Sequence, residues 1–498
     1  MSTTTPIRDI EEWSSPERRI GDQELLPIPN EIYLEIISNI HDRKCLGHLA
    51  LTCRFFAVVA IPKMFRSISI YTRLGSSLTA AWMPAKLLSV IQANSDARAV
   101  SVLEYVQQCS VVLNKLPSTS ASALRFCEDI LLKCPNTREL TVSNRISPNL
   151  FQNISQLSKL SSLKLHIGGT PHCVQAADIA SCASSLRLES LELHLPFSGC
   201  EKAERRIRIE DFVSLAGTPH LRKLVTNSWQ LISGLASQES LPPLEVLTIQ
   251  KVEDLSVAYN LISRIPTLVD LELTRVRWPG GVKRTPSLSS LEEEEAMAQE
   301  SSSSSSELVF SLSPLPNLRH IVLPHHIASL FSGPHSLHCI ELRRDLNDGD
   351  DSDEMHQTNN HPVQLSSSDR LLFDIPCADT VSLELTSPSV KPEESFHGKM
   401  KLWYPKLQNL NFQLMFSTDN EEEYREKMED TFKTFLDSWG PLETLRNLRF
   451  DFVPDYNSPY KGVSDVQDDW FRNLAHKLGL ESYFSNLASV EFAGVKFV

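Results

Sequence analysis

The hydrophobic pattern near the N-terminus predicts an amphipathic helix. In the segment NEIYLEIISNI an isoleucine recurs every fourth residue, at Ile32, Ile36 and Ile40. Because residues four apart share one face of a helix, these side chains form an apolar stripe, which Tyr33 and Ile37 widen. The segment is therefore expected to bury this face against another part of the protein or against a partner.

The next apolar run, CLGHLALTCRFFAVVA, has a similar periodicity and predicts a second helix. Its apolar face comprises Leu46, Leu49, Cys53, Phe56 and Ala60. Pro62 disfavours helical geometry at the residue before it, so this helix is expected to stop there. The segment FRSISIY then alternates Ile68 and Ile70 with serines, which predicts a half-buried strand. Two short helices cannot form a self-sufficient core, so some of their apolar surface must be covered.

One six-residue pattern recurs from about residue 100: an aliphatic residue, two variable ones, an aliphatic residue, one variable one and an apolar residue. Strict copies begin at Leu160, Leu188, Leu244, Leu268, Leu318, Leu337, Leu407, Leu445 and Leu487. Weaker copies begin at Val100, Thr137, Leu221 and Thr380. Each copy predicts a strand with one apolar face, and helix-like stretches such as SVAYNLISRI fill the gaps. An α/β fold follows, and an ordinary α/β domain with a parallel sheet remains an alternative to a repeat array.

The net charge of −14 comes mostly from two low-complexity segments. Residues 291–307 and 345–354 each contain six acids and no bases, which leaves about −2 for the rest of the chain. Such segments bury too little apolar surface to offset the cost of ordering, so disordered acidic inserts are expected near 284–308 and 345–368. A disordered tail is expected over 1–24. The acidic balance argues against nucleic-acid binding, because that requires a basic face.

The order and spacing of the N-terminal apolar residues resemble the F-box family, of the fungal type, over residues 25–66. The match comprises Leu26-Pro27, Glu31-Ile32, Ile36, Ile37, Leu46, Leu49, Cys53, Arg54, Phe56, Ala60, Pro62 and Phe65-Arg66. The resemblance implies that this helix pair docks onto the small Skp-type adaptor of a cullin-based ubiquitin ligase. The residues implied in that contact are Leu26, Pro27, Ile32, Ile36, Leu49, Cys53 and Phe56. The alternative is a helical hairpin that only caps the following domain.

The six-residue pattern resembles the leucine-rich repeat in degenerate form, since the copies from 137 to 268 start 23–33 residues apart. The resemblance implies that residues 67–498 form an irregular solenoid, a curved strand ladder with helices behind it. The variable strand residues would then line the surface that binds a target protein. Candidates on that face are Lys164, His166, Glu192, His194, Gln250, Glu272, Thr274, Glu341, Arg343, Asn411 and Arg449.

Catalytic motifs are missing from the sequence: it contains no G-x-G-x-x-G after a strand, no phosphate-binding G-x-x-x-x-G-K-[ST], no H-E-x-x-H and no G-x-S-x-G. The paired His325 and His326, and His335 and His338 near a strand, are expected to be surface or packing residues. Cys134 is expected to be a small core residue. We therefore expect neither a cofactor nor a metal site, and no enzymatic activity.

Taken together, these patterns predict the substrate-recognition subunit of an SCF-type ubiquitin ligase in the cytoplasm or nucleus. The ten cysteines form no C-x-x-C pair, which is typical of reduced intracellular thiols, and no apolar run is long enough to cross a membrane. The main alternative is a leucine-rich-repeat scaffold that acts outside a ubiquitin ligase. An enzyme built on an α/β domain is a more distant third.

Overall fold

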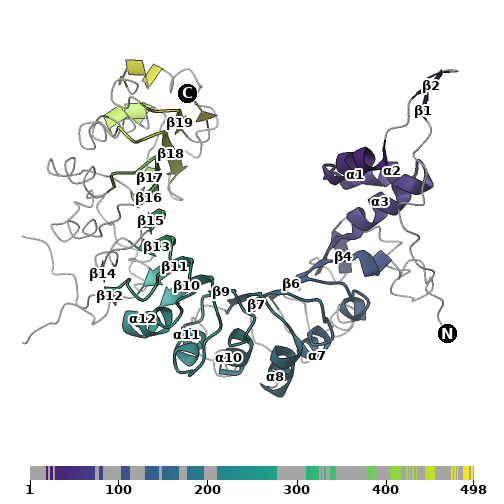
Figure 1. Ribbon diagram of the computed structural model, residues 1–498, viewed down its shortest axis with the longest axis horizontal. Helices are drawn as coiled ribbons and strands as arrows, with labels where there is room; N and C mark the ends of the chain where they lie inside the picture. The colour runs from purple at the N-terminus through teal and green to yellow at the C-terminus, as the bar shows by residue number, and fades with distance from the viewer. Residues whose placement is uncertain are drawn as a thin grey trace, which may run out of the picture. The chain divides into compact units, whose positions relative to one another are not determined.

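The fold was analysed in a computed structural model (Figure 1). It describes residues 18–20, 23–25, 29–72, 78–81, 102–112, 129–144, 149–167, 176–195, 210–276, 310–324, 327, 330–332, 337–343, 380–387, 404–416, 422–423, 425–426, 429–430, 433, 443–454, 473–474, 476–477, 479, 486–492 and 495–496. The chain divides into two compact units, 1–218 and 219–498. The acidic inserts predicted near 284–308 and 345–368 lie outside the described residues, as do His325, His326 and His335.

From Asn30 onward the first unit contains three helices in place of the two predicted. They are α1 (Asn30–Ser38), α2 (Arg43–Ala50) and α3 (Arg54–Phe65). The predicted second helix is broken by a turn at residues 51–53, and Cys53 is the extended N-cap residue of α3. A new helix start also appears at Asp42, whose carboxylate accepts a hydrogen bond from the Lys44 N–H at 3.0 Å.

The prediction that Pro62 stops the second helix was wrong. Pro62 lies inside α3, which continues to Phe65. A proline in a helix removes one N–H of the ladder, a loss that packing must offset. On α3 that packing includes Ala60, which is fully buried in a small core with Ile37 and Leu46. Tertiary packing therefore stabilises α3 beyond Pro62, where local preference alone would end the helix.

Five parallel strands follow in the first unit, in sequence order. They are β3 (Ser67–Thr72), β5 (Gln108–Val112), β6 (Glu139–Asn144), β7 (Ser162–Ile167) and β8 (Ser190–His194). The edge strand β4 (Leu78–Ala81) pairs antiparallel with β3. A separate antiparallel pair, β1 (Arg18–Ile20) and β2 (Gln23–Leu25), lies where the sequence predicts a disordered tail.

The register of these strands aligns their apolar residues into rows. One row joins Ile68, Cys109, Leu140, Leu163 and Leu191, all at most 2% exposed. Because side chains alternate along a strand, the residues between them form a second set of rows on the opposite face. The predicted inward leucines and outward polar residues are thus confirmed for β6, β7 and β8, as are the buried Ile68 and Ile70 of β3.

One predicted copy of the pattern was placed wrongly. The weak copy at Val100 falls partly on a short 3-10 helix, Val102–Tyr105, not on a strand. The strand begins at Gln108, and the apolar residues in register with the neighbouring copies are Cys109 and Val111. The six-residue pattern does not identify this copy, because Cys109 occupies the position that leucine takes elsewhere.

Helices connect the strands and lie to one side of them in Figure 1. In the first unit these are α7 (Leu150–Ile154), α8 (Ala176–Ser185) and α10 (Glu210–Ala216). The fully buried Phe151 and Phe212 meet edge to face at 5.8 Å between ring centroids. The helical layer therefore closes the core on the leucine face and leaves the polar rows of the sheet uncovered by these helices.

The second unit repeats the same construction. Its parallel strands, in sequence order, are β9 (Lys223–Thr226), β10 (Val246–Val252), β11 (Asp270–Val276), β13 (His320–Pro324), β15 (Cys339–Arg343), β16 (Ser382–Ser387), β17 (Asn409–Phe416), β18 (Asn447–Pro454) and β19 (Ser489–Phe492). The last strand, β20 (Val495–Lys496), pairs antiparallel with β19, and β12 (Phe310–Ser311) pairs with β14 (Phe331–Ser332) outside this sheet. Helices α11 (Trp229–Ala236) and α12 (Leu255–Ser263) begin at side-chain caps, Ser228 and Asp254.

A recurring hydrogen-bond pattern sets the register between strands. Within each unit, a single backbone carbonyl, one residue before a parallel strand, accepts the N–H groups of two successive residues at the start of the next parallel strand. In the first unit the Arg138 carbonyl accepts from Ser161 and Ser162, both at 2.9 Å. In the second unit the Val269 carbonyl accepts from Arg319 at 2.9 Å and His320 at 3.1 Å. The fold is thus α/β with a long, repeat-like parallel sheet, and its sequential strand order differs from that of a doubly wound sheet, in which the order reverses.

Candidate functional site

The helical hairpin formed by α1, α2 and α3 exposes large aliphatic side chains. Ile32 and Ile36 on α1 are 49% and 51% exposed, whereas Ile37 is 2% exposed. The sequence places all three on one stripe, but one residue corresponds to a rotation of about 100° around a helix. The structure divides the stripe accordingly, with Ile37 facing the hairpin core and Ile32 and Ile36 facing outward.

The inner face of α1 packs against α3 through aromatic rings. Tyr33 meets Phe55 at 6.1 Å and Phe56 at 5.5 Å between centroids, in edge-to-face geometry. Leu49 and Phe56 are partly buried against the core of Ile37, Leu46 and Ala60. Two of the residues expected to contact an adaptor therefore also hold the hairpin together, while Cys53 is exposed and Leu26 and Pro27 lie outside the described residues.

The hairpin exposes a further aliphatic residue that the periodicity of the sequence does not predict. Leu51 lies in the turn between α2 and α3 and is 85% exposed. The run 45–60 was predicted as a single helix, in which Leu51 would be an interior position. Its spacing is nevertheless compatible with this exposure, because Leu51 lies five residues after Leu46 and is therefore not on the helix face that Leu46 and Leu49 share.

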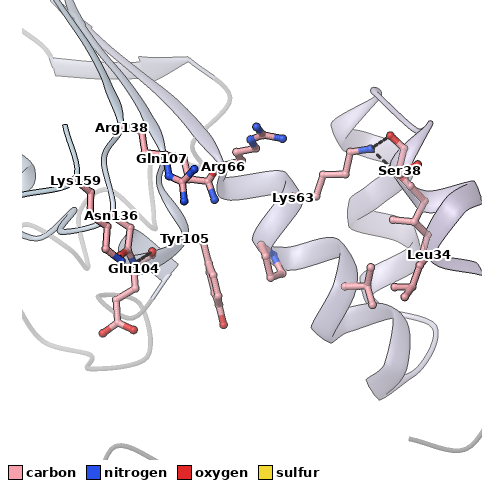
Figure 2. A pocket seen from close by; sticks show the side chains of 13 residues that line it. Leu34, Ser38, Lys63, Arg66, Glu104, Tyr105, Gln107, Asn136, Arg138 and Lys159 are labelled. Carbon is pink, nitrogen blue, oxygen red and sulfur yellow. Dashed lines mark hydrogen bonds between the residues drawn. The ribbon is translucent and has the colours of Figure 1, made fainter. Parts of the chain in front are cut away.

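A pocket of about 670 Å³ lies where the hairpin meets the first strands (Figure 2). On the hairpin side, the Lys63 ammonium donates to the carbonyls of Ile37 at 2.6 Å and Ser38 at 2.5 Å. Both carbonyls lie in the last turn of α1, where a cation also complements the helix dipole. Lys63 of α3 therefore ties the end of α1 to α3.

The opposite wall of this pocket is held by polar bonds between repeats. The Asn136 amide donates to the Glu104 carbonyl at 2.6 Å, and Lys159 donates to the Asn136 side-chain oxygen at 2.5 Å. At the base, the Arg66 carbonyl accepts from the N–H groups of Gln107 at 2.8 Å and Gln108 at 3.0 Å. Much of the polar lining is thus engaged within the protein, and we interpret the pocket as a joint that fixes the hairpin to the sheet.

The predicted target-binding residues of the first unit come together on the outward face of β7 and β8. Register pairs Lys164 with Glu192 and His166 with His194. The Glu192 carboxylate lies 3.1 Å from the Lys164 ammonium, 3.2 Å from His166 Nε2 and 2.9 Å from His194 Nε2. The two imidazole centroids are 4.5 Å apart. Residues 28 positions apart in sequence thus form one compact polar cluster.

The electrostatics of this cluster favour a charged carboxylate beside neutral imidazole at His166. Burial, and then the neighbouring His194, lower the pKa of His166. Burial alone would raise the pKa of Glu192, but hydrogen bonds from Lys164 and His194 outweigh it, and the net pKa is lowered. The carboxylate is therefore ionised at neutral pH, and its charge is compensated by its neighbours.

The predicted residues of the second unit lie on one outward row or next to it. Register runs from Glu341 through Glu384 and Asn411 to Arg449 and Glu491. Arg449 donates to Asp451 at 2.9 and 3.0 Å and lies 3.7 Å from Glu491. Glu384 and Glu491 are not among the residues predicted for this face, although both occupy the same position of the six-residue pattern as Glu341. This row carries three acids and one base.

The remaining candidates of this unit are arranged nearby. Glu272 is in register with Val322, and its carboxylate accepts from the Thr248 hydroxyl at 3.2 Å. The Thr274 hydroxyl donates to the Gln250 carbonyl at 2.9 Å, so both stabilise the β10–β11 pair. Arg343 lies on β15 in register with Pro324. Some of the polar side chains on this face therefore form hydrogen bonds with neighbouring side chains or with the backbone of the adjacent strand.

Cys134, expected in the core, and His338, expected on the surface or in packing, occupy such positions. Cys134 is fully buried, its carbonyl accepts from the Thr137 hydroxyl at 2.8 Å, and burial raises the pKa of its thiol to about 12. His338 is exposed, and its carbonyl accepts two N–H groups of the next repeat.

None of the described helices is both long and apolar enough to span a bilayer. Compared with protein-family models and with curated proteins, the sequence gives no significant match.

Proposed function

We propose that this protein is the substrate-recognition subunit of an SCF-type ubiquitin ligase, with an F-box-type hairpin and a degenerate leucine-rich-repeat array. One observation carries the proposal: a hairpin with its own small core presents Ile32, Ile36 and Leu51 to solvent. Three large aliphatic side chains left exposed on so small an element are typical of a docking surface rather than of a cap. The F-box resemblance supplies the occupant, a small Skp-type adaptor that receives the hairpin in an apolar groove.

The energetics suit such a contact. Burying an exposed aliphatic side chain stabilises a complex by about 1.5–3 kcal/mol, before the costs of association are subtracted. Three such residues would supply much of the affinity, while Leu49 and Phe56 act by keeping the hairpin folded. In this proposal the outward face of α1 and the turn at Leu51 make the contact, and the inner aromatic cluster fixes their geometry.

The strand array would then hold the target protein. Its outward rows carry both acids and bases, which favours a polar protein partner over a nucleic acid or a membrane. Leucine-rich repeats explain why a polar strand position recurs at each repeat while the leucines stay buried. The asparagine that commonly closes a regular repeat strand is missing from most copies, so the array is of an irregular kind.

The mechanism requires no covalent step by this chain, no cofactor and no catalytic residue. The hairpin holds the adaptor and through it the cullin, and the array holds the target, so that a substrate lysine is kept at high local concentration near a ubiquitin-loaded enzyme. The joint around Lys63 and Asn136 would keep the first strands in a fixed position relative to the adaptor. Such an assembly would work in the cytoplasm or the nucleus.

The test is co-purification of the full-length protein with a Skp-type adaptor after co-expression. Ile36→Asp and Leu51→Asp each place a charge at an exposed position, so they should weaken adaptor binding at least tenfold while leaving the circular dichroism spectrum unchanged. Leu132→Asp is the matched control, because Leu132 is also apolar and 43% exposed but lies outside the hairpin. Failure of the wild-type chain to bind the adaptor, or equal binding by all three variants, would overturn the proposal and favour a repeat scaffold outside a ubiquitin ligase.

The same variants allow a search for the target. Affinity purification under proteasome inhibition would compare the wild-type protein with the Ile36→Asp, Leu51→Asp double variant. Proteins retained by both are target candidates, and proteins lost with the double variant belong to the ligase. This design keeps the array intact, which deletion of residues 26–66 would not, because Arg43 of α2 donates to the Ser67 carbonyl at the start of β3.

A further inference from the structure

The cluster on β7 and β8 has the composition of a transition-metal site. His166, Glu192 and His194 each offer one ligand atom, and these three atoms lie within 4.8 Å of one another. Two imidazoles and one carboxylate form a ligand set that proteins use for Zn²⁺ and related divalent ions. Among the residues that the structure describes, this is the one cluster of three or more such groups.

The distances are close to those that a bound ion requires. Ligand bonds of about 2.0–2.1 Å in tetrahedral geometry place neighbouring ligand atoms roughly 3.4 Å apart. The Glu192 Oε1 atom lies 3.2 Å from His166 Nε2 and 2.9 Å from His194 Nε2. The same two ring nitrogens therefore already converge on one carboxylate oxygen, and small side-chain rotations would open room for an ion between them.

We propose that His166, Glu192 and His194 bind a divalent transition-metal ion of the Zn²⁺ class. The three side chains are 43%, 20% and 21% exposed, so an ion there would be reachable from solvent and would keep one coordination position open. All three residues come from a rigid parallel strand pair, which holds the ligands without a mobile loop. A donor group of a target protein, or a water molecule, would complete the coordination.

Lys164 has a defined place in this site. Its ammonium lies 3.1 Å from Glu192 Oε2, the carboxylate oxygen that faces away from the two imidazoles. This contact orients the carboxylate so that Oε1 points at the ligand position, as outer hydrogen bonds commonly do around metal ligands. The positive charge of Lys164 also repels a cation, so the affinity is set by both effects, and Lys164 itself is not a ligand.

The inference is independent of the ubiquitin-ligase proposal, because it requires only the β7–β8 pair. It also differs from the prediction that the chain has no metal site. His166 and His194 are 28 residues apart and belong to no metal-ligand spacing motif, so only the strand register brings them together.

The test is a zinc titration of the purified full-length protein by isothermal calorimetry. The wild-type chain should bind one more equivalent of Zn²⁺ than the His166→Ala, His194→Ala double variant, and Glu192→Gln should weaken that equivalent at least tenfold. Comparing stoichiometries separates this site from any that the cysteines provide. Mg²⁺, which prefers oxygen ligands, should not compete.

Thr141→Ala is the matched control, because Thr141 is in register with Lys164 on the same face of the sheet but is not a ligand of the proposed site. It should retain the additional zinc equivalent. Thermal melting followed by circular dichroism verifies that each variant is folded. The proposal is overturned if wild type and double variant bind equal numbers of equivalents with equal affinity, or if Thr141→Ala loses zinc as completely as the histidine variants.

Discussion

The helical hairpin and the strand array differ in how completely they bury their apolar side chains. In the array, the inward residue of each parallel strand is buried: Leu224, Leu271, Leu383 and Leu448 are at most 1% exposed. In the hairpin, one small core of Ile37, Leu46 and Ala60 is accompanied by three aliphatic side chains left about half exposed or more.

The difference indicates where each region meets its partner. A repeat buries its leucines against the neighbouring repeat, so only its polar outward positions are available for binding. A hairpin of three short helices has too little neighbouring surface to cover all its apolar residues. Its outward isoleucines therefore suggest an apolar contact, whereas the array offers a polar one. Substitutions that act oppositely on the two regions test this contrast most directly.

The largest difference is expected in thiol reactivity. Cys53 of the hairpin is exposed, whereas Cys134 and Cys182 of the array are buried, and burial raises the pKa of both thiols to about 12. At pH 8 a thiol with that pKa is ionised in about one molecule in ten thousand, and the thiolate is the reactive form. Maleimide labelling of the native protein, followed by mass spectrometry, should modify Cys53 at least a hundredfold faster than either buried thiol. Equal rates in the native protein would contradict the described burial; equal rates in denaturant are the expected control.

The next difference concerns stability. Leu191→Ala removes a side chain with 0% exposure from a row of the array and should lower the free energy of unfolding by about 2–5 kcal/mol. Ile36→Ala makes a similar truncation at a position with 51% exposure and should change it by no more than about 0.5 kcal/mol. Urea denaturation followed by circular dichroism measures both. Comparable losses would show that Ile36 is packed within the chain rather than available to a partner.

A smaller effect is expected at the joint. Lys63→Met removes the ammonium that binds the Ile37 and Ser38 carbonyls and should destabilise the end of α1 by about 1 kcal/mol. Amide hydrogen exchange should then speed up about fivefold in α1, with little change in β7 or β8. Lys44→Met, on the exposed surface of α2, is the matched control and should leave exchange unaltered. If the two variants behave alike, Lys63 does not hold the hairpin in place.

Much of the sheet could be predicted from sequence because its signal is local. Alternation of leucine with polar residues specifies a strand and its buried face, and the predicted strands at β7, β10 and β17 are confirmed. The copy at Val100 failed where Cys109 replaces an aliphatic residue in the true register. The pattern thus identifies the fold class well and individual repeats less well.

The candidate sites were harder to predict because they depend on contacts distant in sequence. Periodicity could not show which isoleucines of α1 face α3, since Ile36 and Ile37 both satisfy a helical stripe. The continuation of α3 through Pro62 depends on tertiary packing that no local preference encodes. The cluster of His166, Glu192 and His194 required the strand register, because each residue alone is an ordinary outward position.

The shared carbonyl before each strand has a consequence for how the protein can change in length. Asp270 is in register with Val246, 24 residues earlier, and equally with His320, 50 residues later. Because the doubled hydrogen bond to Val269 resets the alignment at the next strand, extra residues between strands do not shift the rows that follow. Connecting segments can therefore lengthen or be exchanged while the outward surface stays the same. An epitope tag inserted between β11 and β13 would provide a detection handle without altering the polar row that begins at Glu341.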